Sequence, residues 1–381
     1  MAGFFSGHDF APNRIELEFR KAENKKGFIN LAGSNPTYEG LIFPPDILKK
    51  AAEPYFRHRR YSPDPKGLSS ARSAISGYYG KRAPSLQIMP DDIFVTASTS
   101  ESYGLLFALL ADPGDNLLAP KVSYPLFEHL AAIHHVKLRT YDMDEDDGWS
   151  IRESSIISGA DERTRAIIIV SPHNPTGMVV KCALPALDRL GLPVICDEVF
   201  AGFPYGVPDI PPLGALHGKL PVFHLNGISK MFGLPDLKLG WIAISGTGVR
   251  DYEKRLELIN DTYLGANYLV QSILPAIFDE GIGFVEHMRT RIRTGIDCAL
   301  LLLSKNRRIK ALRPDGGYYL FPKIDTGEDE EELVLRLLKN CGVLVHPGYY
   351  YDCDEGTHIM ISCLTEIEKL SEGLKRIVPF I

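Results

Sequence analysis

One lysine and one carboxylate stand just after two apolar runs of the chain, at spacings that suit cofactor chemistry. Asp197 follows the run 194–196, and Lys230 follows the run 222–225 after a short turn. A lysine amine can form a Schiff base with a carbonyl group. A carboxylate beside a pyridinium nitrogen keeps the ring protonated and makes it a better electron sink. The pair therefore suits a cofactor that carries both a carbonyl group and a pyridine ring.

Other apolar runs are also followed by polar side chains, namely Ser98, Thr99 and Ser100 after 93–95, Tyr124 after 117–118, and Asn174 after 166–170. Small hydroxyl residues that open a helix form an anion site from backbone N–H groups and the helix dipole. In an open α/β sheet, ligands bind outside the carboxyl ends of the strands, so we expect all these groups at one edge. Together they describe a phosphate-bearing pyridine aldehyde, pyridoxal 5′-phosphate (PLP).

The elements that must position these groups alternate along the chain. Short runs rich in Val and Ile recur from about residue 90 to 245, with helical patterns between them, at 101–110, 125–133 and 184–190. Such alternation predicts an α/β domain with a mainly parallel sheet. We expect a large three-layer domain over 46–275.

The character of the chain changes after about Asp251. Two long helical stretches, 252–278 and 285–304, lead into short strands and helices, as expected of an α+β domain. We expect the smaller domain to combine 1–45 with 276–381.

Composition excludes several classes of protein. Among 381 residues, 45% are hydrophobic and 24% charged, which is typical of a folded globular protein rather than a disordered one. Lys plus Arg number 42 against 48 Asp plus Glu, a net charge of −6 that does not suggest a nucleic-acid partner. No apolar run approaches the ~20 residues that cross a bilayer, and 1–20 does not resemble a secretory signal. Six scattered cysteines without a C-x-x-C pair argue against a metal site and fit a reduced, cytoplasmic protein.

From Asn30 to the C-terminus the chain resembles the class I/II aminotransferases, which are PLP enzymes of fold type I. The resemblance is carried, in chain order, by Tyr61-Ser62-Pro63, Ser98–Glu101, Asp112-Pro113-Gly114-Asp115, Ser123-Tyr124-Pro125, Asn174-Pro175-Thr176-Gly177, Asp197-Glu198, Ser229-Lys230, Lys238-Leu239-Gly240-Trp241, Gly316-Gly317-Tyr318 and Pro347-Gly348. The order of Asn174, Asp197 and Lys230 is the most specific part.

The resemblance implies a role for each candidate residue. Lys230 would form the internal aldimine with PLP and then move the α-proton, and Asp197 would pair with the pyridine nitrogen. Asn174 would bond the ring's phenolic oxygen and approach the substrate carboxylate, and Tyr124 would stack on the ring. Residues expected to hold the phosphate are Ser98, Thr99, Ser100 and Lys238, with Tyr61 reaching the phosphate of a neighbouring subunit. The family thus implies a homodimer that acts on an amino donor and a 2-oxo acid.

Each of these side chains also has a structural interpretation. Lys230 would be an ordinary surface lysine, Asp197 a helix cap, and Tyr124 part of the core. Tyr61 ends a basic, aromatic stretch, 55–61, that would suit a solvated helix end. Their order along the chain favours the functional interpretation.

The chain departs from the family at four positions. Lys238 stands where an arginine is usual, Phe200 where a tyrosine often donates to the ring oxygen, and Gly227 where a serine often binds phosphate. The most serious departure is Met360, at the place of the arginine that clamps the substrate carboxylate, because a bidentate charge-assisted pair is lost. Arg60, Arg313 and His346 are substitutes by proximity to site motifs only.

Four functions remain open from the sequence. A PLP-dependent aminotransferase leads, and a C–S β-lyase or decarboxylase on the same fold is the alternative. A PLP-binding regulator is disfavoured because the balance is acidic and the fold begins by about Ile29, leaving no room for a DNA-binding domain. A degenerate binder is disfavoured because Asn174, Asp197 and Lys230 are all present.

Overall fold

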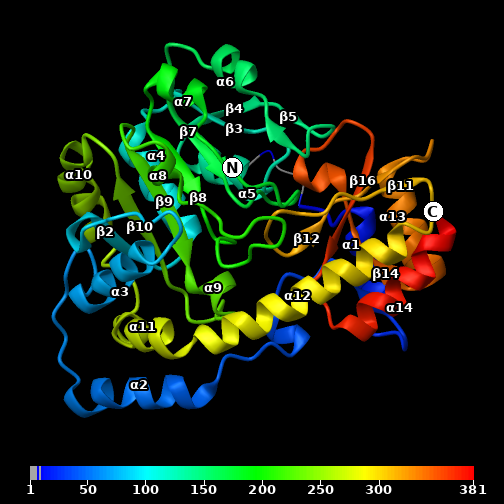
Figure 1. The fold of residues 1–381 in the computed structure, drawn as a ribbon, viewed down its shortest axis with the longest axis horizontal. Coiled ribbons are helices and arrows are strands. Elements are labelled where there is room, and N and C mark those ends of the chain that lie inside the picture. The colour runs from blue at the N-terminus through cyan, green and yellow to red at the C-terminus, as the bar shows by residue number, and fades with distance from the viewer. Residues whose placement is uncertain (1–6, 8–9) are drawn as a thin grey trace.

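The computed structural model describes Gly7 and residues 10–381, so parts of the stretches 1–20 and 1–45 lie outside the described residues. Its larger sheet has seven strands in the order β2 (Ile93–Thr96), β10 (Gly240–Ser245), β9 (Val222–Gly227), β8 (Val194–Asp197), β7 (Thr164–Val170), β3 (Asn116–Pro120) and β4 (Lys137–Tyr141). Strand β10 is antiparallel to both neighbours, and the others run parallel (Figure 1).

Apart from the edge strand β4, the strands of this sheet are buried on both faces. Ile195 and Phe223 pack on one face with side chains of α4 (Thr99–Leu110), α5 (Leu126–Ile133) and α10 (Val249–Thr262). Cys196 and Val222 pack on the other face with α3 (Ser69–Gly80) and α11 (Tyr268–Glu280). Neighbours along a strand point to opposite faces, so a near-continuous apolar run is what a sheet covered on both sides requires. The three-layer α/β architecture predicted from the sequence is confirmed.

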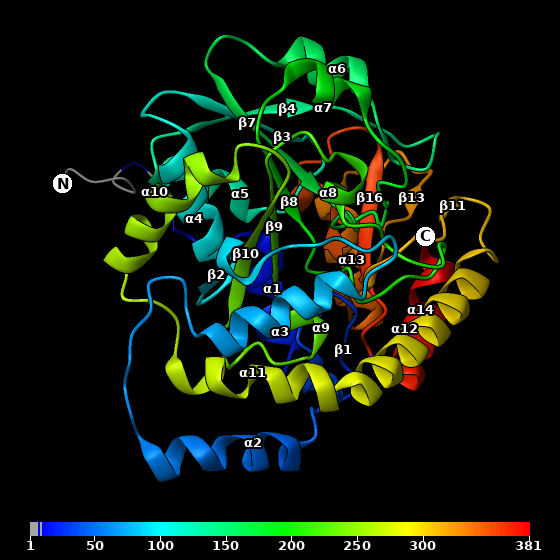
Figure 2. The same ribbon diagram turned by 60° about the vertical axis from the view of Figure 1, so that its left-hand side comes forward.

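A smaller sheet lies beside the large one and is entirely antiparallel. Its strands are β11 (Ile309–Lys310), β13 (Lys323–Ile324), β16 (Thr357–Ser362) and β12 (Tyr319–Leu320), with β15 (His346–Pro347) also paired to β16. The helices around it are α1 (Arg14–Ala22), α12 (Ile282–Leu303), α13 (Glu330–Cys341) and α14 (Ile367–Ile377), of which the long α12 runs diagonally at the lower right in Figure 2. Near the N-terminus, β1 (Ile29–Asn30) pairs with β14 (Val343–Leu344). The exact domain boundaries stay a prediction.

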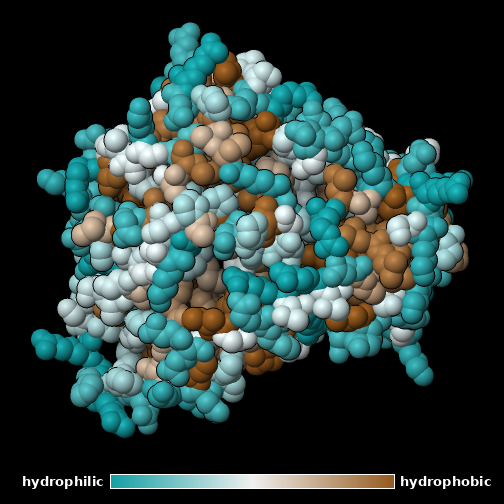
Figure 3. All heavy atoms as spheres, viewed as in Figure 1, coloured by the Kyte–Doolittle hydropathy of each residue, from teal (hydrophilic) through white to brown (hydrophobic). Residues whose placement is uncertain are grey.

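Several shorter elements complete the described chain. They are α2 (Pro45–His58), β5 (Met143–Asp144), β6 (Ser150–Ile151), α6 (Glu153–Gly159), α7 (Pro185–Leu190), α8 (Leu213–Leu216), α9 (Ile228–Met231) and four 3₁₀ turns: η1 (Pro36–Glu39), η2 (Pro90–Asp92), η3 (Gly348–Tyr351) and η4 (Val378–Phe380). On the face in Figure 3, hydrophilic side chains cover most of the surface, and apolar ones form small patches between them.

One sequence expectation about elements is wrong, and one strand was not predicted from the sequence. The stretch 252–278 is not one helix but two, α10 and α11. Leu264 and Gly265 between them have φ of 64° and 72°, and the Asn267 side chain caps α11 by accepting from the Val270 N–H. Strand β4 was missed because most of it is exposed at the edge of the sheet, so it has no apolar run.

In the described part of the chain, no single helix is long and apolar enough to cross a bilayer. The pair α11 and α12 reaches that length only across a bend of 66°.

Candidate functional site

The polar residues of the larger sheet meet at one edge because of its topology. Strands β2, β7, β8 and β9 all end there, and β10, which runs the other way, begins there. Its first residue, Gly240, lies opposite Gly227 of β9 and Thr96 of β2. This reversal brings Lys238, two residues before β10, to the same edge as Asp197 and Lys230.

A cleft of about 290 Å³ lies at this edge. Eight of the nine site residues predicted from the sequence line it: Ser98, Thr99, Ser100, Tyr124, Asn174, Asp197, Lys230 and Lys238. Two further residues line the cleft: Ser34, which follows β1, and Tyr319, which belongs to β12. The cleft is therefore walled by the larger sheet on one side and by residues near the smaller sheet on the other.

Asp197 is held by neutral donors only. Its Oδ2 accepts from the Tyr103 hydroxyl at 2.9 Å, and its Oδ1 accepts from the Val199 N–H at 3.0 Å. Asp197 is the last residue of β8 and shares the face of Ile195, which is the α4 side, so Tyr103 of α4 reaches it. Burial raises the pKa of Asp197 to about 6, although these two hydrogen bonds oppose the rise. A cationic donor from a ligand would stabilise this carboxylate.

Lys230 lies in α9, the short helix that follows β9. Burial lowers the pKa of its amine, and the nearby Asp197 opposes that shift. The Tyr318 hydroxyl donates to the Lys230 carbonyl at 2.5 Å. A residue of the Gly316-Gly317-Tyr318 motif thus fixes the backbone from which the lysine reaches into the cleft.

The loop that carries Asn174 is fixed by its neighbours. His173 Nε2 donates to the Val122 carbonyl at 2.9 Å, so its Nδ1 accepts from the Thr176 hydroxyl, also at 2.9 Å. Gly177 has φ of +75°, and a side chain there would come within 2.3 Å of Pro314. The Asn174 Oδ1 atom is buried and has no hydrogen-bond partner in the described chain. Asn174 also lines the cleft, so its side-chain amide lies beside a ligand site.

The start of α4 forms the other end of the cleft. The Ser98 hydroxyl accepts from the Glu101 N–H, and the Glu101 carboxylate accepts from the Ala97 N–H at 2.5 Å. This arrangement resembles a capping box and occupies two N–H groups. Thr99 and Ser100, the next residues, line the cleft at the positive end of the helix. A Cβ at Gly240 would lie 3.0 Å from the Thr99 nitrogen, so glycine is needed where β10 passes this turn.

Two of the departures from the family have a structural consequence here. Phe200 lines the cleft and packs edge-on against Tyr318 and Tyr319, at 4.8 and 5.7 Å between ring centres. A Cβ at Gly227 would lie 2.7 Å from the Leu239 carbonyl oxygen. A serine therefore cannot replace Gly227 unless that backbone moves.

Tyr61 is the one predicted site residue that this chain does not bring to the cleft. Its side chain is 69% exposed and packs against Tyr268 of α11. Its expected role requires a second subunit, so that role stays a prediction.

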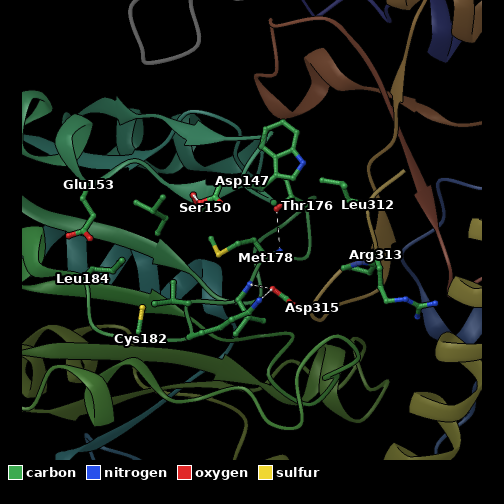
Figure 4. Close-up of a pocket in the computed structure, with 17 residues that line it drawn as sticks. Asp147, Ser150, Glu153, Thr176, Met178, Cys182, Leu184, Leu312, Arg313 and Asp315 are labelled. Atoms are coloured by element: carbon green, nitrogen blue, oxygen red, sulfur yellow. Dashed lines mark hydrogen bonds and ion pairs between the residues drawn. The ribbon is translucent and has the colours of Figure 1, made fainter. Parts of the chain in front are cut away.

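Of the substitutes for the missing arginine, Arg313 lies elsewhere. It lines a separate cavity of about 560 Å³ behind the Asn174 loop and pairs with Asp297 at 2.6 Å. Figure 4 shows Arg313 extending away from Cys182 and Leu184 on the opposite wall of that cavity. Met360 is 1% exposed and lies opposite His346 in the β15–β16 pair.

Sequence reasoning missed three residues that shape the site, namely Tyr103, His173 and Tyr319. Tyr103 lies in α4 a little beyond Ser98–Glu101, and His173 precedes Asn174, so both were near motifs that had been recognised. Tyr319 follows the Gly316-Gly317-Tyr318 motif. Only Ser98 and Glu101, spaced as in a capping box, carried a signal for the local geometry.

The residues of the cleft fit PLP. A buried carboxylate without a cation suits a pyridinium nitrogen, and a lysine whose pKa is lowered by burial suits an aldehyde. Asn174 lines the cleft, where its side-chain N–H could donate to the ring oxygen, and the start of α4 with Lys238 suits a phosphate.

Comparisons with known proteins agree with this geometry. The model of the family "Aminotransferase class I and II" matches residues 26–377. The chain is 28% identical to tyrosine aminotransferase of Dictyostelium discoideum over 337 residues, covering 84% of this chain and 80% of that protein. It is 27% identical to S-alkyl-thiohydroximate lyase of Arabidopsis thaliana over 333 residues, covering 82% of this chain and 71% of that protein.

Among solved structures, alanine aminotransferase from Pyrococcus furiosus superposes with a TM-score of 0.91 at 26% identity, covering 100% of this chain and 99% of that one. The match therefore extends through both sheets and includes the cleft between them. Because the family model, the sequence relatives and the fold agree over nearly the whole length, the chain belongs to the class I and II aminotransferase family.

Proposed function

We propose that this PLP-dependent aminotransferase moves an amino group between an amino acid and a 2-oxo acid with Lys230 as its acid–base group. The observation that carries the proposal is that Lys230 and Asp197 line one buried cleft, where burial lowers the pKa of the amine and raises that of the carboxyl. Perturbed titratable groups that converge in a cleft are typical of catalytic sites.

The roles proposed for the other residues follow from their positions. Lys230 would hold the aldehyde carbon of PLP, Asp197 its ring nitrogen, and Asn174 its ring oxygen. Tyr124, 39% exposed at the cleft rim, would cover the ring. The phosphate would lie at the start of α4, where Ser98, Thr99, Ser100 and Lys238 line the cleft.

Bound PLP would supply an electron sink for the charge left on the substrate's α-carbon when its proton is removed. The Lys230 amine would take that proton and return it to another carbon, a transfer that positioned bases accelerate about 10²–10⁴-fold. The lowered pKa of Lys230 favours the neutral amine that this step needs. Tyr103 and Val199 would keep the Asp197 carboxylate oriented throughout.

The test is a half-reaction on purified, PLP-loaded protein mixed with one amino acid at a time. Transamination converts the visible absorbance band to a near-ultraviolet band and stops after one equivalent of 2-oxo acid. Lys230→Ala should show no conversion, whereas Lys369→Ala, which removes an exposed lysine on α14, should behave as the wild type. If no amino acid produces the conversion, the proposal is wrong.

A C–S β-lyase remains the second candidate, since one relative is named a lyase. With a sulfur-containing amino acid such as cystathionine, a lyase would turn over repeatedly and release ammonia and a thiol. The aminotransferase would instead stop after one equivalent without ammonia.

We further propose that two copies of the chain assemble with Tyr61 completing the partner's cleft. Helix α2 lies along the outside of the molecule, next to α11, and buries no residue (Figures 1 and 2). Large apolar side chains near it are exposed, with Phe56 at 59% and Leu264 of the turn before α11 at 82%. Sedimentation should show a dimer that Phe56→Asp weakens, and a monomeric wild type with full activity would contradict the proposal.

A further inference from the structure

The wall of the cleft opposite the larger sheet is set by the pairing of three short strands. Tyr319 of β12 lies opposite Ser362 of β16, and His346 of β15 lies opposite Met360 of β16. Met360 and Ser362 are two residues apart, so they share one face of the sheet, and their cross-strand partners share it too. Because Tyr319 lines the cleft, His346 and Met360 belong to the cleft-facing side.

This wall lacks a charge that could hold a substrate carboxylate. Among the described residues that line the cleft, the only cations are Lys230 and Lys238. The proposed function uses Lys230 beside Asp197 and Lys238 beside the cofactor phosphate. A carboxylate moved out of water without a cation or a set of hydrogen-bond donors is strongly disfavoured. An amino acid or 2-oxo acid therefore needs a further donor from this wall.

A histidine and a tyrosine lie together behind the cleft-lining residues of this wall. The His346 Nδ1 atom lies 3.3 Å from the Tyr351 hydroxyl. Tyr351 is 6% exposed. Burial, with smaller contributions from Tyr319 and Tyr124, raises the pKa of Tyr351, so the phenol keeps its proton. The Ser123 N–H donates to the Tyr351 carbonyl at 2.8 Å, so Tyr351 lies beside the loop that carries Tyr124 of the cleft rim.

We propose that His346, acting through Tyr351, is the positioning residue for the substrate carboxylate, and that binding of the carboxylate draws one proton from solvent onto the imidazole. The tyrosine hydroxyls donate to the carboxylate, and the protonated imidazole supplies the positive charge behind them. No other bond forms or breaks in this step. The inference deepens the proposed function, because it assumes that the cleft is the substrate site.

The pH dependence of carboxylate binding follows from the surroundings of His346. Tyr350 and Tyr351 of η3 contact the ring, Met360 lies across from it, and these groups are uncharged at neutral pH. Burial lowers the pKa of free His346 to about 4. A carboxylate within about 4–6 Å raises a histidine pKa by about 1–3 units. Between the free and the bound pKa, carboxylate affinity falls as pH rises, and above the bound pKa it levels off.

Calorimetry on the PLP-loaded protein tests this coupling without turnover. Propionate is the carboxylate probe, and propionamide is the uncharged control of the same shape. Titrations near pH 6, where propionate is ionised, in buffers that differ in ionisation enthalpy, should show proton uptake with propionate and none with propionamide. Propionate affinity should fall by up to about tenfold per pH unit within the window. No proton uptake, or equal uptake with both probes, would overturn the inference.

Variants separate His346 from the other groups that titrate in the cleft. His346→Gln should abolish the proton uptake, whereas Tyr350→Phe, which changes the other tyrosine beside His346, should keep it. Met360→Arg should bind propionate about 10–100-fold more tightly, even when combined with His346→Gln, because the guanidinium replaces the lost charge. Undiminished proton uptake in His346→Gln would assign the coupling to another residue, such as Asp197, and overturn the inference.

The two proposals fail in different ways. If the half-reaction with amino acids proceeds but propionate binding takes up no proton, only the role of His346 is wrong. If no amino acid is converted while propionate binding still takes up a proton through His346, the reaction is wrong and the carboxylate site stands.

Discussion

The two walls of the cleft are built by different means. The wall of the larger sheet places Asp197 and Lys230 where two neighbouring parallel strands end, and their surroundings are fixed by hydrogen bonds to Tyr103, Val199 and Tyr318. The opposite wall comes from strands of two to six residues, in which His346 and Met360 meet only through the register of β15 on β16. The first wall follows a general rule of α/β folds, and the second depends on the register of short strands.

The departures from the family differ in kind between the walls. On the wall of the larger sheet, Lys238 keeps the positive charge that arginine usually supplies, and Gly227 leaves room for the Leu239 carbonyl. On the opposite wall, Met360 removes a charge outright. From this comparison we expect cofactor chemistry to be retained and carboxylate binding to be rebuilt. Variants of each wall test this distinction.

The largest effect is expected from removing the acid–base group. Lys230→Ala should slow amino transfer by at least about 10²–10⁴-fold, because Lys238, the other lysine among the described residues of the cleft, is assigned to the cofactor phosphate. Single-turnover absorbance with the best amino acid measures the loss. If Lys230→Ala keeps more than about a tenth of the wild-type rate, the acid–base role belongs to another residue, and the contrast between the walls loses its basis.

Asp197→Asn should reduce the single-turnover rate by about 10²–10³-fold, an effect typical of losing one preorganised electrostatic partner. Tyr103→Phe removes only the hydroxyl that donates to Asp197 Oδ2 and should have a smaller effect. If Tyr103→Phe is as damaging as Asp197→Asn, the orientation of the carboxylate matters more than its charge.

Although Asp197→Asn should slow the reaction, it should stabilise the cofactor-free protein. Since burial raises the pKa of Asp197 to about 6, its contribution to the free energy of unfolding is fully present below about pH 4. That contribution is lost as pH rises to about 6. The ionised carboxylate should then destabilise the cofactor-free fold by about 2–3 kcal/mol at pH 7.5. Urea unfolding should therefore find Asp197→Asn more stable than the wild type at pH 7.5, with little difference near pH 4.

How much the sequence could predict also differs between the walls. The ends of apolar strands locate Asp197, Asn174 and Lys230 because parallel strands end at one edge. Lys238 reaches the same edge only because β10 runs antiparallel to its neighbours, and composition does not reveal the direction of a strand. On the opposite wall, Tyr319 and His346 are separated by 27 positions and become neighbours only through β16. Pairing of strands this short depends on tertiary packing, so local patterns carry little signal for it.

Lys238→Arg should have the smallest effect and gives the sharpest comparison with Met360→Arg. Both substitutions introduce the arginine that the family usually has, Lys238→Arg on the wall of the larger sheet and Met360→Arg on the opposite wall. Because Lys238 already supplies the charge, we expect PLP affinity to change by only a few-fold, in the tighter direction if the guanidinium grips the phosphate bidentately. Lys238→Ala should weaken it by about 10–100-fold.

Equilibrium titration of the cofactor-free protein with PLP measures these affinities. Lys238 has φ of 51°, a backbone conformation that the arginine must also adopt, so the substitution leaves the local strain unchanged. The gain in PLP affinity from Lys238→Arg could be as large as the gain in propionate affinity from Met360→Arg. The wall of the larger sheet would then have lost as much binding free energy as the opposite wall. In that case the change from the family pattern affects cofactor binding as well as carboxylate binding. Lysine in place of arginine at position 238, which keeps the charge, would then matter as much as methionine at position 360, which removes it.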